Sequence, residues 1–247
     1  MAVLFFLSQV IKLFLNQVSF NFSENKTLVM FEYKGIKIRW LGHNSFSIVG
    51  KIKIIIDPFK ITKQEKADLI LISHNHFDHL SVADLKNIST ENTTIVAANE
   101  CIDMLKGFAF KEKIGISPGE EKAVLGIKIK ATRAYNVDKI NPETKKPFHP
   151  KEDDKIGFLI NLNGNTIYHT GDTDLIPEMS DLKPDIALVP VSGTYVMTAK
   201  EAAKAVEKIK PKIVIPMHFG TIIGSEKDAH DFKKLIKSCE VQILTKE

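Results

Sequence analysis

The sequence predicts an α/β fold in which two mixed sheets pack face to face and helices cover their outer faces. Three observations carry this prediction: each half opens with strands joined by turns, each half ends in alternating strands and helices, and no linker or repeat divides residues 31–247. A sheet with one apolar face must bury that face against a second layer. A chain of 247 residues is long enough to bury a sizeable core.

The first half opens as a meander closed by Asp57 and Pro58. Apolar and polar residues alternate there at period two, which predicts strands at 36–41, 45–49 and 52–56. Two strand–helix units follow, with strands at 68–72 and 94–97 and helices ending at 88 and 105. Ser81 is the expected N-cap of the first of these helices, because its hydroxyl can accept a backbone N–H of the first turn.

The second half repeats this plan. Apolar patterning predicts strands at 127–133, 156–162, 166–169, 186–189, 213–217 and 241–244, and helices at 199–209 and 228–237. Asn163-Gly164 is a strong hairpin signal, and Thr198 is the expected cap of the first helix. One long irregular stretch runs from 136 to 154. Loops of that length in a compact domain are usually functional or disordered.

The composition is that of an ordinary globular protein, with 44% hydrophobic and 26% charged residues. A net charge of +4 favours an anionic substrate only weakly and comes without the basic stripe of nucleic-acid binders, so no nucleic-acid partner is expected. Cys101 and Cys239 lie far apart and outside any C-x-x-C spacing. This usage predicts a reducing, cytoplasmic location with neither a disulfide framework nor a cysteine-ligated zinc.

Residues 1–30 form an apolar N-terminal extension that stands apart from the domain at 31–247. The longest apolar run, Met1–Leu7, is too short to span a bilayer, and neither a basic n-region nor a cleavage site is clear. Two interpretations stay open. Residues 1–20 form an amphipathic helix that lies on a membrane, a partner or the domain itself, or Met30 is the true start. A homo-oligomer is also left open.

The most informative segment is Ser73–Leu80, which follows the apolar run 68–72. It holds four metal-capable side chains within six residues: His74, His76, Asp78 and His79. At a strand end these side chains lie at the rim of a sheet, and without partners they would bring costly polar groups to a buried position. A divalent metal satisfies them, and an open metal site is a catalytic one.

Further metal-capable residues follow other strands. Asp172 comes just after the strand at 166–169, and His218 ends the strand at 213–217. Open α/β folds place their ligand sites at such strand ends. Imidazoles and carboxylates without cysteine suit zinc, with manganese or iron as alternatives.

Taken in order, the H-x-H-x-D-H motif at 74–79, Gly171-Asp172-Thr173 and the segment 216–220 resemble the signature of the metallo-β-lactamase superfamily. Trp40-Leu41-Gly42-His43, with Ile56-Asp57-Pro58 after it, resembles its metal-dependent hydrolase branch, which is similar to the L-ascorbate-6-phosphate lactonases and the phospholipase D acting on N-acylphosphatidylethanolamine. The resemblance covers about residues 36–220 and implies a four-layer αββα sandwich.

The resemblance also implies a pair of divalent metal ions and their ligands. His74 and His76 hold one metal with a third histidine, Asp78, His79 and His218 hold the second, and Asp172 bridges the two. In the superfamily the third histidine comes before the bridging aspartate in chain order, and His149 comes before Asp172 in this way. His169 is the alternative.

The expected activity is hydrolysis of an ester, lactone or phosphodiester bond in a small, anionic molecule by a metal-bridging hydroxide. Asp78 is the candidate to orient that hydroxide, and His43 is either a catalytic pocket residue or a satisfied core histidine. Asp57 either bonds a ligating imidazole or caps the turn before Pro58. Tyr195 either lines the pocket or packs. A nuclease of the same fold, and a metal-binding protein without turnover, are the alternative functions.

Overall fold

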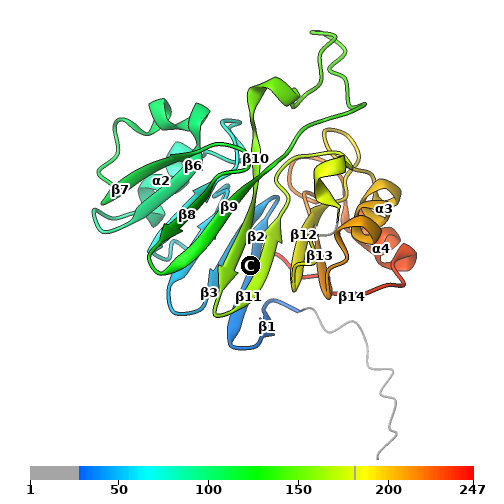
Figure 1. The fold of residues 1–247 in the computed structure, drawn as a ribbon, viewed down its shortest axis with the longest axis horizontal. Coiled ribbons are helices and arrows are strands. Elements are labelled where there is room, and N and C mark those ends of the chain that lie inside the picture. Colours follow the sequence, from blue (N-terminus) through cyan, green and yellow to red (C-terminus); the bar gives the residue numbers. More distant parts are fainter. Residues whose placement is uncertain (1–27, 181) are drawn as a thin grey trace, which may run out of the picture.

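A computed structural model describes residues 28–180 and 182–247. Two seven-stranded sheets pack face to face with helices on the outside, which confirms the predicted α/β sandwich of two mixed sheets (Figure 1). Residues 1–27 lie outside the described part of the chain, so the prediction of an amphipathic helix at 1–20 stays a prediction.

The first sheet follows chain order. Its strands are β1 (Phe31–Tyr33), β2 (Ile36–Gly42), β3 (Ser45–Val49), β4 (Lys53–Ile56), β5 (Leu69–Ile72), β6 (Thr94–Ala98) and β7 (Glu112–Ile116). Strands β1 to β4 pair antiparallel, and β4 to β7 pair parallel. Parallel neighbours need crossover connections, which explains why strand–helix units follow the meander.

The second sheet repeats the same order. Its strands are β8 (Glu121–Val124), β9 (Ile127–Arg133), β10 (Ile156–Leu162), β11 (Asn165–His169), β12 (Ile186–Pro190), β13 (Ile213–Met217) and β14 (Glu240–Val241). Strands β8 to β11 pair antiparallel, and β11 to β14 pair parallel. Asn163 and Gly164 both have positive φ (53° and 74°), as the predicted tight hairpin between β10 and β11 requires.

Within residues 28–180 and 182–247, three α-helices lie outside the sheets: α2 (Val82–Ile88), α3 (Ala199–Ile209) and α4 (Glu226–Leu235) (Figure 1). The predicted caps are confirmed, since Ser81 accepts a hydrogen bond from the backbone of Asp84 and Thr198 forms a capping box with Glu201. Three short 3₁₀ helices cover Asn99–Leu105, Lys151–Asp153 and Pro177–Met179. The first of them stands where an α-helix was predicted.

Three strands were not predicted: β1, β7 and β8. Each lies at or near a sheet edge and is mostly exposed or half-buried, so its sequence lacks a clear apolar alternation. The predicted last strand at 241–244 is also shorter, because only Glu240–Val241 forms a ladder and Leu244 makes an isolated bridge to Leu28.

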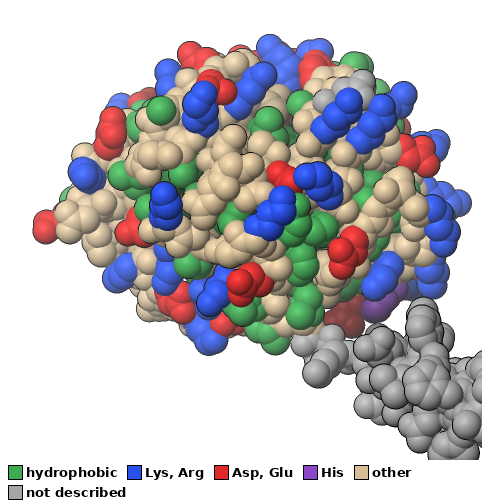
Figure 2. Space-filling model, turned by 60° about the horizontal axis from the view of Figure 1, so that its bottom comes forward, with side chains coloured by type: hydrophobic (Ala, Val, Ile, Leu, Met, Phe, Trp, Pro, Cys, Tyr) green, Lys and Arg blue, Asp and Glu red, His purple; other side chains and the backbone are tan. Residues whose placement is uncertain are grey.

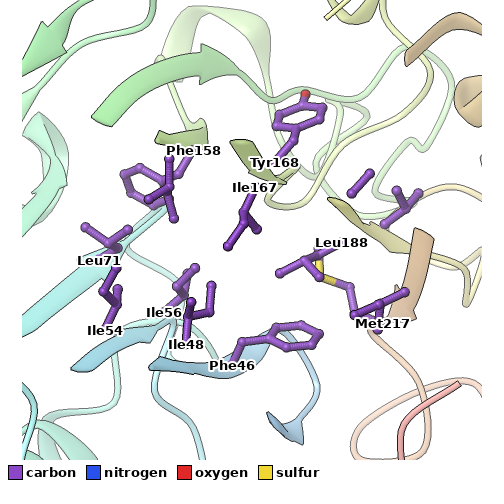
Figure 3. Packing of buried hydrophobic residues seen from close by; sticks show 14 of the residues in the cluster. Phe46, Ile48, Ile54, Ile56, Leu71, Phe158, Ile167, Tyr168, Leu188 and Met217 are labelled. Atoms are coloured by element: carbon purple, nitrogen blue, oxygen red, sulfur yellow. The ribbon is translucent and has the colours of Figure 1, made fainter. Parts of the chain in front are cut away.

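The core lies between the sheets. Figure 3 shows Ile48, Ile54 and Ile56 of the first sheet facing Phe158, Ile167 and Leu188 of the second, and all six are fully buried. Their burial over both sheets joins the two halves into one apolar cluster. Face-to-face burial of this kind is the dominant stabilising term in such a sandwich.

The surface is polar and mixed in charge. On the face seen in Figure 2, cationic and anionic side chains are interspersed. None of the helices in the described part of the chain has the length and apolar character needed to cross a bilayer.

Candidate metal centre

The candidate ligands lie on loops that leave the carboxyl ends of strands in both sheets. The segment 73–80 follows β5, His43 follows β2, Asp172 follows β11, and His218 follows β13. His149 lies in the irregular stretch 136–154 that precedes β10. Backbone hydrogen bonds join the two halves here, since the His218 N–H donates to the His43 carbonyl and the Ile156 N–H to the Ser73 carbonyl, so polar loop residues of both halves come together at one rim of the sandwich.

A first group joins His74, His76 and His149, whose ligand nitrogens all lie within 4.8 Å of one another. His74 Nε2 is 3.1 Å from His76 Nδ1, and the His149 ring lies 5.1 Å from that of His74 between centroids. The structure thus places the predicted third histidine beside the other two.

The alternative, His169, is engaged elsewhere. Its Nε2 lies 2.9 Å from the Asn44 carbonyl oxygen, and its Nδ1 accepts from the Gly171 N–H at 3.2 Å. With both ring nitrogens bonded to the backbone, His169 ties β11 to the loop after β2.

A second group joins His43, Asp78, His79 and His218, again within 4.8 Å. Asp78 Oδ2 accepts a hydrogen bond from His43 Nε2 at 2.9 Å and lies 3.8 Å from His79 Nε2. The rings of His43 and His218 lie 4.0 Å apart between centroids. Asp78, His79 and His218 therefore converge, as the resemblance implies, and His43 lies against them.

The Asp172 carboxylate lies between the two groups. Its Oδ2 is 3.4 Å from His149 Nε2, 3.4 Å from His79 Nε2 and 3.1 Å from His218 Nε2. Its Oδ1 accepts from Asn44 Nδ2 at 2.6 Å. One carboxylate thus contacts imidazoles from both groups, which is the position a bridging ligand needs.

Asp57 supports the His74–His79 loop. Its Oδ2 accepts from His79 Nδ1 at 2.9 Å and from Ser73 Oγ at 2.6 Å, and its Oδ1 accepts the Ser73 N–H at 2.7 Å. Of the two interpretations left open for Asp57, the structure therefore supports the hydrogen bond to an imidazole. In metal sites such a bond fixes the tautomer and the orientation of the imidazole, and it leaves His79 Nε2 free to act as a ligand.

The Nδ1 atoms of two further histidines, His149 and His218, also have side-chain hydrogen-bond partners, and the sequence did not predict these partners. Asn136 Oδ1 accepts both from the backbone N–H of His149 and from its Nδ1, each at 2.9 Å. Ser192 Oγ lies 2.9 Å from His218 Nδ1. Asn44 and Ser73 each lie next to a motif histidine, and this adjacency could have predicted their role as hydrogen-bond partners. Asn136 and Ser192 lie far from any motif, so nothing in the sequence predicts theirs.

Three site residues adopt left-handed backbone conformations: His43 (φ 51°), Asp57 (φ 43°) and His218 (φ 61°). Each costs of order 1–3 kcal/mol in a residue with a Cβ, and such strain persists only where the surroundings hold it. The His218 N–H donates to the His43 carbonyl at 3.0 Å, which joins two of the strained positions.

The pKa shifts follow from burial and from the two carboxylates. Burial lowers the pKa of His74 well below its usual value and that of His149 to about 3, so both are neutral imidazoles, the form that binds metal. Burial also acts to lower the pKa of His79, but Asp172 and Asp57 outweigh it and raise that pKa well above the ordinary value. The Asp172 and Asp57 carboxylates thus favour a positive charge beside His79.

The residues fit a divalent metal. Nε2 of His79 and Nε2 of His149 are buried without a hydrogen-bond partner among the described residues, although each faces Asp172. A buried polar atom left unsatisfied costs about 1–3 kcal/mol, so it needs a ligand. The donors are nitrogen and oxygen with no thiolate, which suits zinc, manganese or iron.

A cleft of about 460 Å³ opens over this cluster. His76, Asp78, His149 and Asp172 form its floor, and the rest of its lining is Asn75, Phe77, Phe148, Tyr195 and Ile222. Tyr195 therefore both lines the cleft and packs edge-on against Phe148, at 4.7 Å between ring centroids. His43 is fully buried below the floor.

A family model for the beta-lactamase superfamily domain matches residues 37–218. The chain belongs to this superfamily. It is 37% identical to a UPF0173 metal-dependent hydrolase of Thermococcus onnurineus, over 85% of this chain and 96% of that one. A second UPF0173 metal-dependent hydrolase, from Archaeoglobus fulgidus, is 33% identical over 82% of this chain and 91% of its own length.

Solved structures agree with this membership. A metallo hydrolase of Ignicoccus hospitalis superposes with a TM-score of 0.68 at 27% identity, covering 85% of this chain and 94% of that one. A candidate metal-dependent hydrolase of Parabacteroides distasonis gives a TM-score of 0.74 at 29% identity, over 87% and 98% of the two chains. The resemblance inferred from the motifs is thereby confirmed at the level of the superfamily and its fold.

Proposed function

We propose that this protein is a hydrolase that uses two divalent metal ions, with zinc the best suited and manganese or iron as alternatives, to cleave an ester, lactone or phosphodiester bond. The observation that carries the proposal is the position of Asp172, whose Oδ2 lies within 3.4 Å of imidazoles from both histidine groups. The chain also belongs to a superfamily that includes metal-dependent hydrolases, and this membership supports the same reaction class.

In this proposal each metal has its own ligands. His74, His76 and His149 hold one, Asp78, His79 and His218 hold the other, and Asp172 is shared. When bound, a pair of divalent ions supplies an acidified water and polarises the bond to be cleaved.

Asp78 has two features that suit it to orient the attacking water. It lies on the cleft floor, and its side chain retains 15% exposure, so it reaches solvent and substrate. Burial by itself would raise its pKa, but the hydrogen bond from His43 and the charge interactions with His79 and His43 together outweigh burial and lower the pKa to about 2. Asp78 therefore stays an ionised hydrogen-bond acceptor at neutral pH.

His43 acts through Asp78. It is fully buried, and burial lowers its pKa to about 4, so the neutral ring donates from Nε2 to the Asp78 carboxylate. We assign it a positioning role, because it contacts the carboxylate and does not line the cleft.

Metal content and turnover test the proposal together. Protein loaded with zinc or manganese is expected to bind two metals per chain by elemental analysis and to hydrolyse at least one generic ester, lactone or phosphodiester. The exposed His230→Ala on α4 is the matched control and should keep both metals. One metal or none would contradict the two-metal proposal, and two metals without turnover would favour the metal-binding alternative.

Labelled RNA and DNA test the nuclease alternative in the same assay. Nuclease tracks carry cationic side chains for the phosphates, and no Lys or Arg is among the described residues lining the cleft. Metal-dependent cleavage of either polymer would overturn our preference. The cytoplasmic location and a homo-oligomer stay predictions.

A further inference from the structure

Apart from its four metal-capable residues and Asn75, the cleft above the candidate metal centre is lined by apolar and aromatic side chains. Phe77 is 70% exposed and Ile222 is 40% exposed, and both border the cleft, so they present apolar surface to whatever binds there. Phe148 and Tyr195 add an edge-on aromatic pair to the lining. Apolar atoms removed from water at such walls favour binding in proportion to their area.

No free positive charge faces this cleft from the described residues that line it, since none is Lys or Arg. Two lysines of the surrounding segments, Lys155 and Lys139, are already paired with carboxylates, and Lys60 lies over the Phe59 ring. Lys155, whose charge acts on His76, is buried 3.2 Å from Glu100 and 3.4 Å from Asp153. Lys139 of the irregular stretch lies 3.0 Å from Glu201 and 3.4 Å from Asp174. An anionic group at the far end of a substrate would therefore meet apolar walls and paired lysines, which disfavours it.

The aromatic pair also leads out of the cleft. Phe148 and Tyr195 line a second, neighbouring cleft of about 540 Å³, together with Ile140 and Pro142. Because the two clefts share these rings, they adjoin each other on either side of the pair. Glu143, an acid, also lines the second cleft, so this end too disfavours an anion.

We propose that the substrate is an uncharged ester or lactone with an extended apolar acyl or alkyl part, which lies between Ile222, Phe77 and the Phe148–Tyr195 pair. This inference rests on the proposed hydrolase function. It replaces the expectation of an anionic substrate, because that expectation came from the net charge of +4, which describes the whole surface and not the cleft.

The reaction balances without a further reactant. The oxygen of water forms the new bond to the acyl carbon, the ester C–O bond breaks, and the leaving alkoxide takes up the proton that water gives up. An ester gives an alcohol and a carboxylic acid, whereas a lactone gives a single hydroxy acid, and in both cases the acid releases its proton to solvent at neutral pH.

A pair of matched esters tests the inference on the metal-loaded, full-length protein. p-Nitrophenyl hexanoate and the mono-p-nitrophenyl ester of adipic acid have six-carbon acyl chains and differ in a terminal carboxylate. We expect kcat/KM for the hexanoate to be at least tenfold higher, and to rise about two- to fourfold per methylene from acetate to hexanoate. A kcat/KM for the adipate ester equal to or above that of the hexanoate would overturn the inference and leave the hydrolase proposal standing.

Ile222→Lys places a cation at the cleft wall. It is expected to lower the hexanoate-to-adipate ratio at least fivefold. Leu235→Lys on α4, which is 45% exposed and outside the cleft, is the matched control and should leave the ratio unchanged. An unchanged ratio in Ile222→Lys would contradict the placement of the acyl chain.

A binding measurement separates failure of this inference from failure of the proposed function. N-Methylhexanamide and its carboxylate-ended adipic counterpart are not cleaved as esters are, so ligand-observed NMR reports recognition alone. Saturation transfer to the neutral amide that weakens in Ile222→Lys supports the inference even if no ester is hydrolysed, in which case only the hydrolase proposal fails. Equal or stronger transfer to the anionic amide would overturn the inference.

Discussion

The two halves of the molecule have the same strand plan but supply the metal centre in different ways. In each half four strands pair antiparallel and the remaining three continue the sheet in parallel, β1 to β7 in one and β8 to β14 in the other. The first half supplies four ligand candidates from the loop after β5, and the second half supplies three from separate segments. Equal folds thus do not imply equal sites.

The difference has a structural consequence. The loop after β5 positions its side chains partly by itself, since the backbone N–H groups of His79 and Leu80 both donate to the His76 carbonyl. His149, Asp172 and His218 have no such shared turn. Each depends on a separate side chain, and these are Asn136, Asn44 and Ser192. The second half is therefore where single changes outside the ligands should have the larger effect.

Asp172→Ala should have the largest effect, because this carboxylate contacts histidines from both halves. We expect bound metal to fall from two per chain to at most one, and kcat/KM to fall by about 10³-fold or more, since metal stabilisation of a transition state is worth several kcal/mol. Elemental analysis and steady-state kinetics measure both. A variant that retained two metals would refute the bridging role.

His76→Ala and His149→Ala compare one candidate ligand from each half within the same histidine group. Each is expected to lose one metal and to reduce kcat/KM by at least about 10²-fold, because losing a ligand exceeds the 10–100-fold effect of losing an outer partner. The measurement is metal content after dialysis. If His149→Ala alone kept both metals, His149 would not be a ligand. A different histidine would then have to complete the group of His74 and His76.

Asn136→Ala and Ser73→Ala remove outer partners from the second and the first half. We expect metal affinity to fall about 10–100-fold in Asn136→Ala, because His149 Nδ1 then loses the side-chain oxygen that accepts its hydrogen bond. In Ser73→Ala we expect a fall of about tenfold, because Asp57 still bonds His79. Competition with a chelator gives both affinities.

Asn136→Asp is the matched control for this pair. It keeps an acceptor oxygen for His149 Nδ1 and should restore most of the affinity. A larger loss in Ser73→Ala than in Asn136→Ala would reverse the proposed difference between the halves.

Thr198→Ala and Ser81→Ala should have the smallest effects, on stability alone. Each removes an N-cap and is expected to lower the free energy of unfolding by about 1 kcal/mol. Thr198→Ala should cost more, since it dismantles a capping box on α3, whereas Ser81 accepts a single bond of 3.3 Å on α2. Urea denaturation gives the free energies, and metal affinity should not change. A greater cost for Ser81→Ala would contradict this ranking.

Much of the fold followed from local pattern. Strands such as β3 and β13 were predictable because continuous or alternating burial leaves a clear apolar signal. Strands β7 and β8 were not, because charged residues such as Glu112 and Glu121 occupy their exposed faces. At the candidate site the motif His74–His79 was evident because its members are adjacent. Asn136 was not, because it lies 13 residues from the His149 it bonds, in a stretch without periodicity.

By itself the sequence determined the superfamily, the two-sheet architecture and the residue types of a metal centre, because strand periodicity and contiguous motifs are local properties of a chain. Only the tertiary structure distinguished His149 from His169, gave His43 its contact with Asp78 and set Asp172 between two groups of histidines. Those relations join segments up to 125 residues apart, as between His169 and Asn44. They arise only when the sheets pack and bring the strand ends of both halves to one rim.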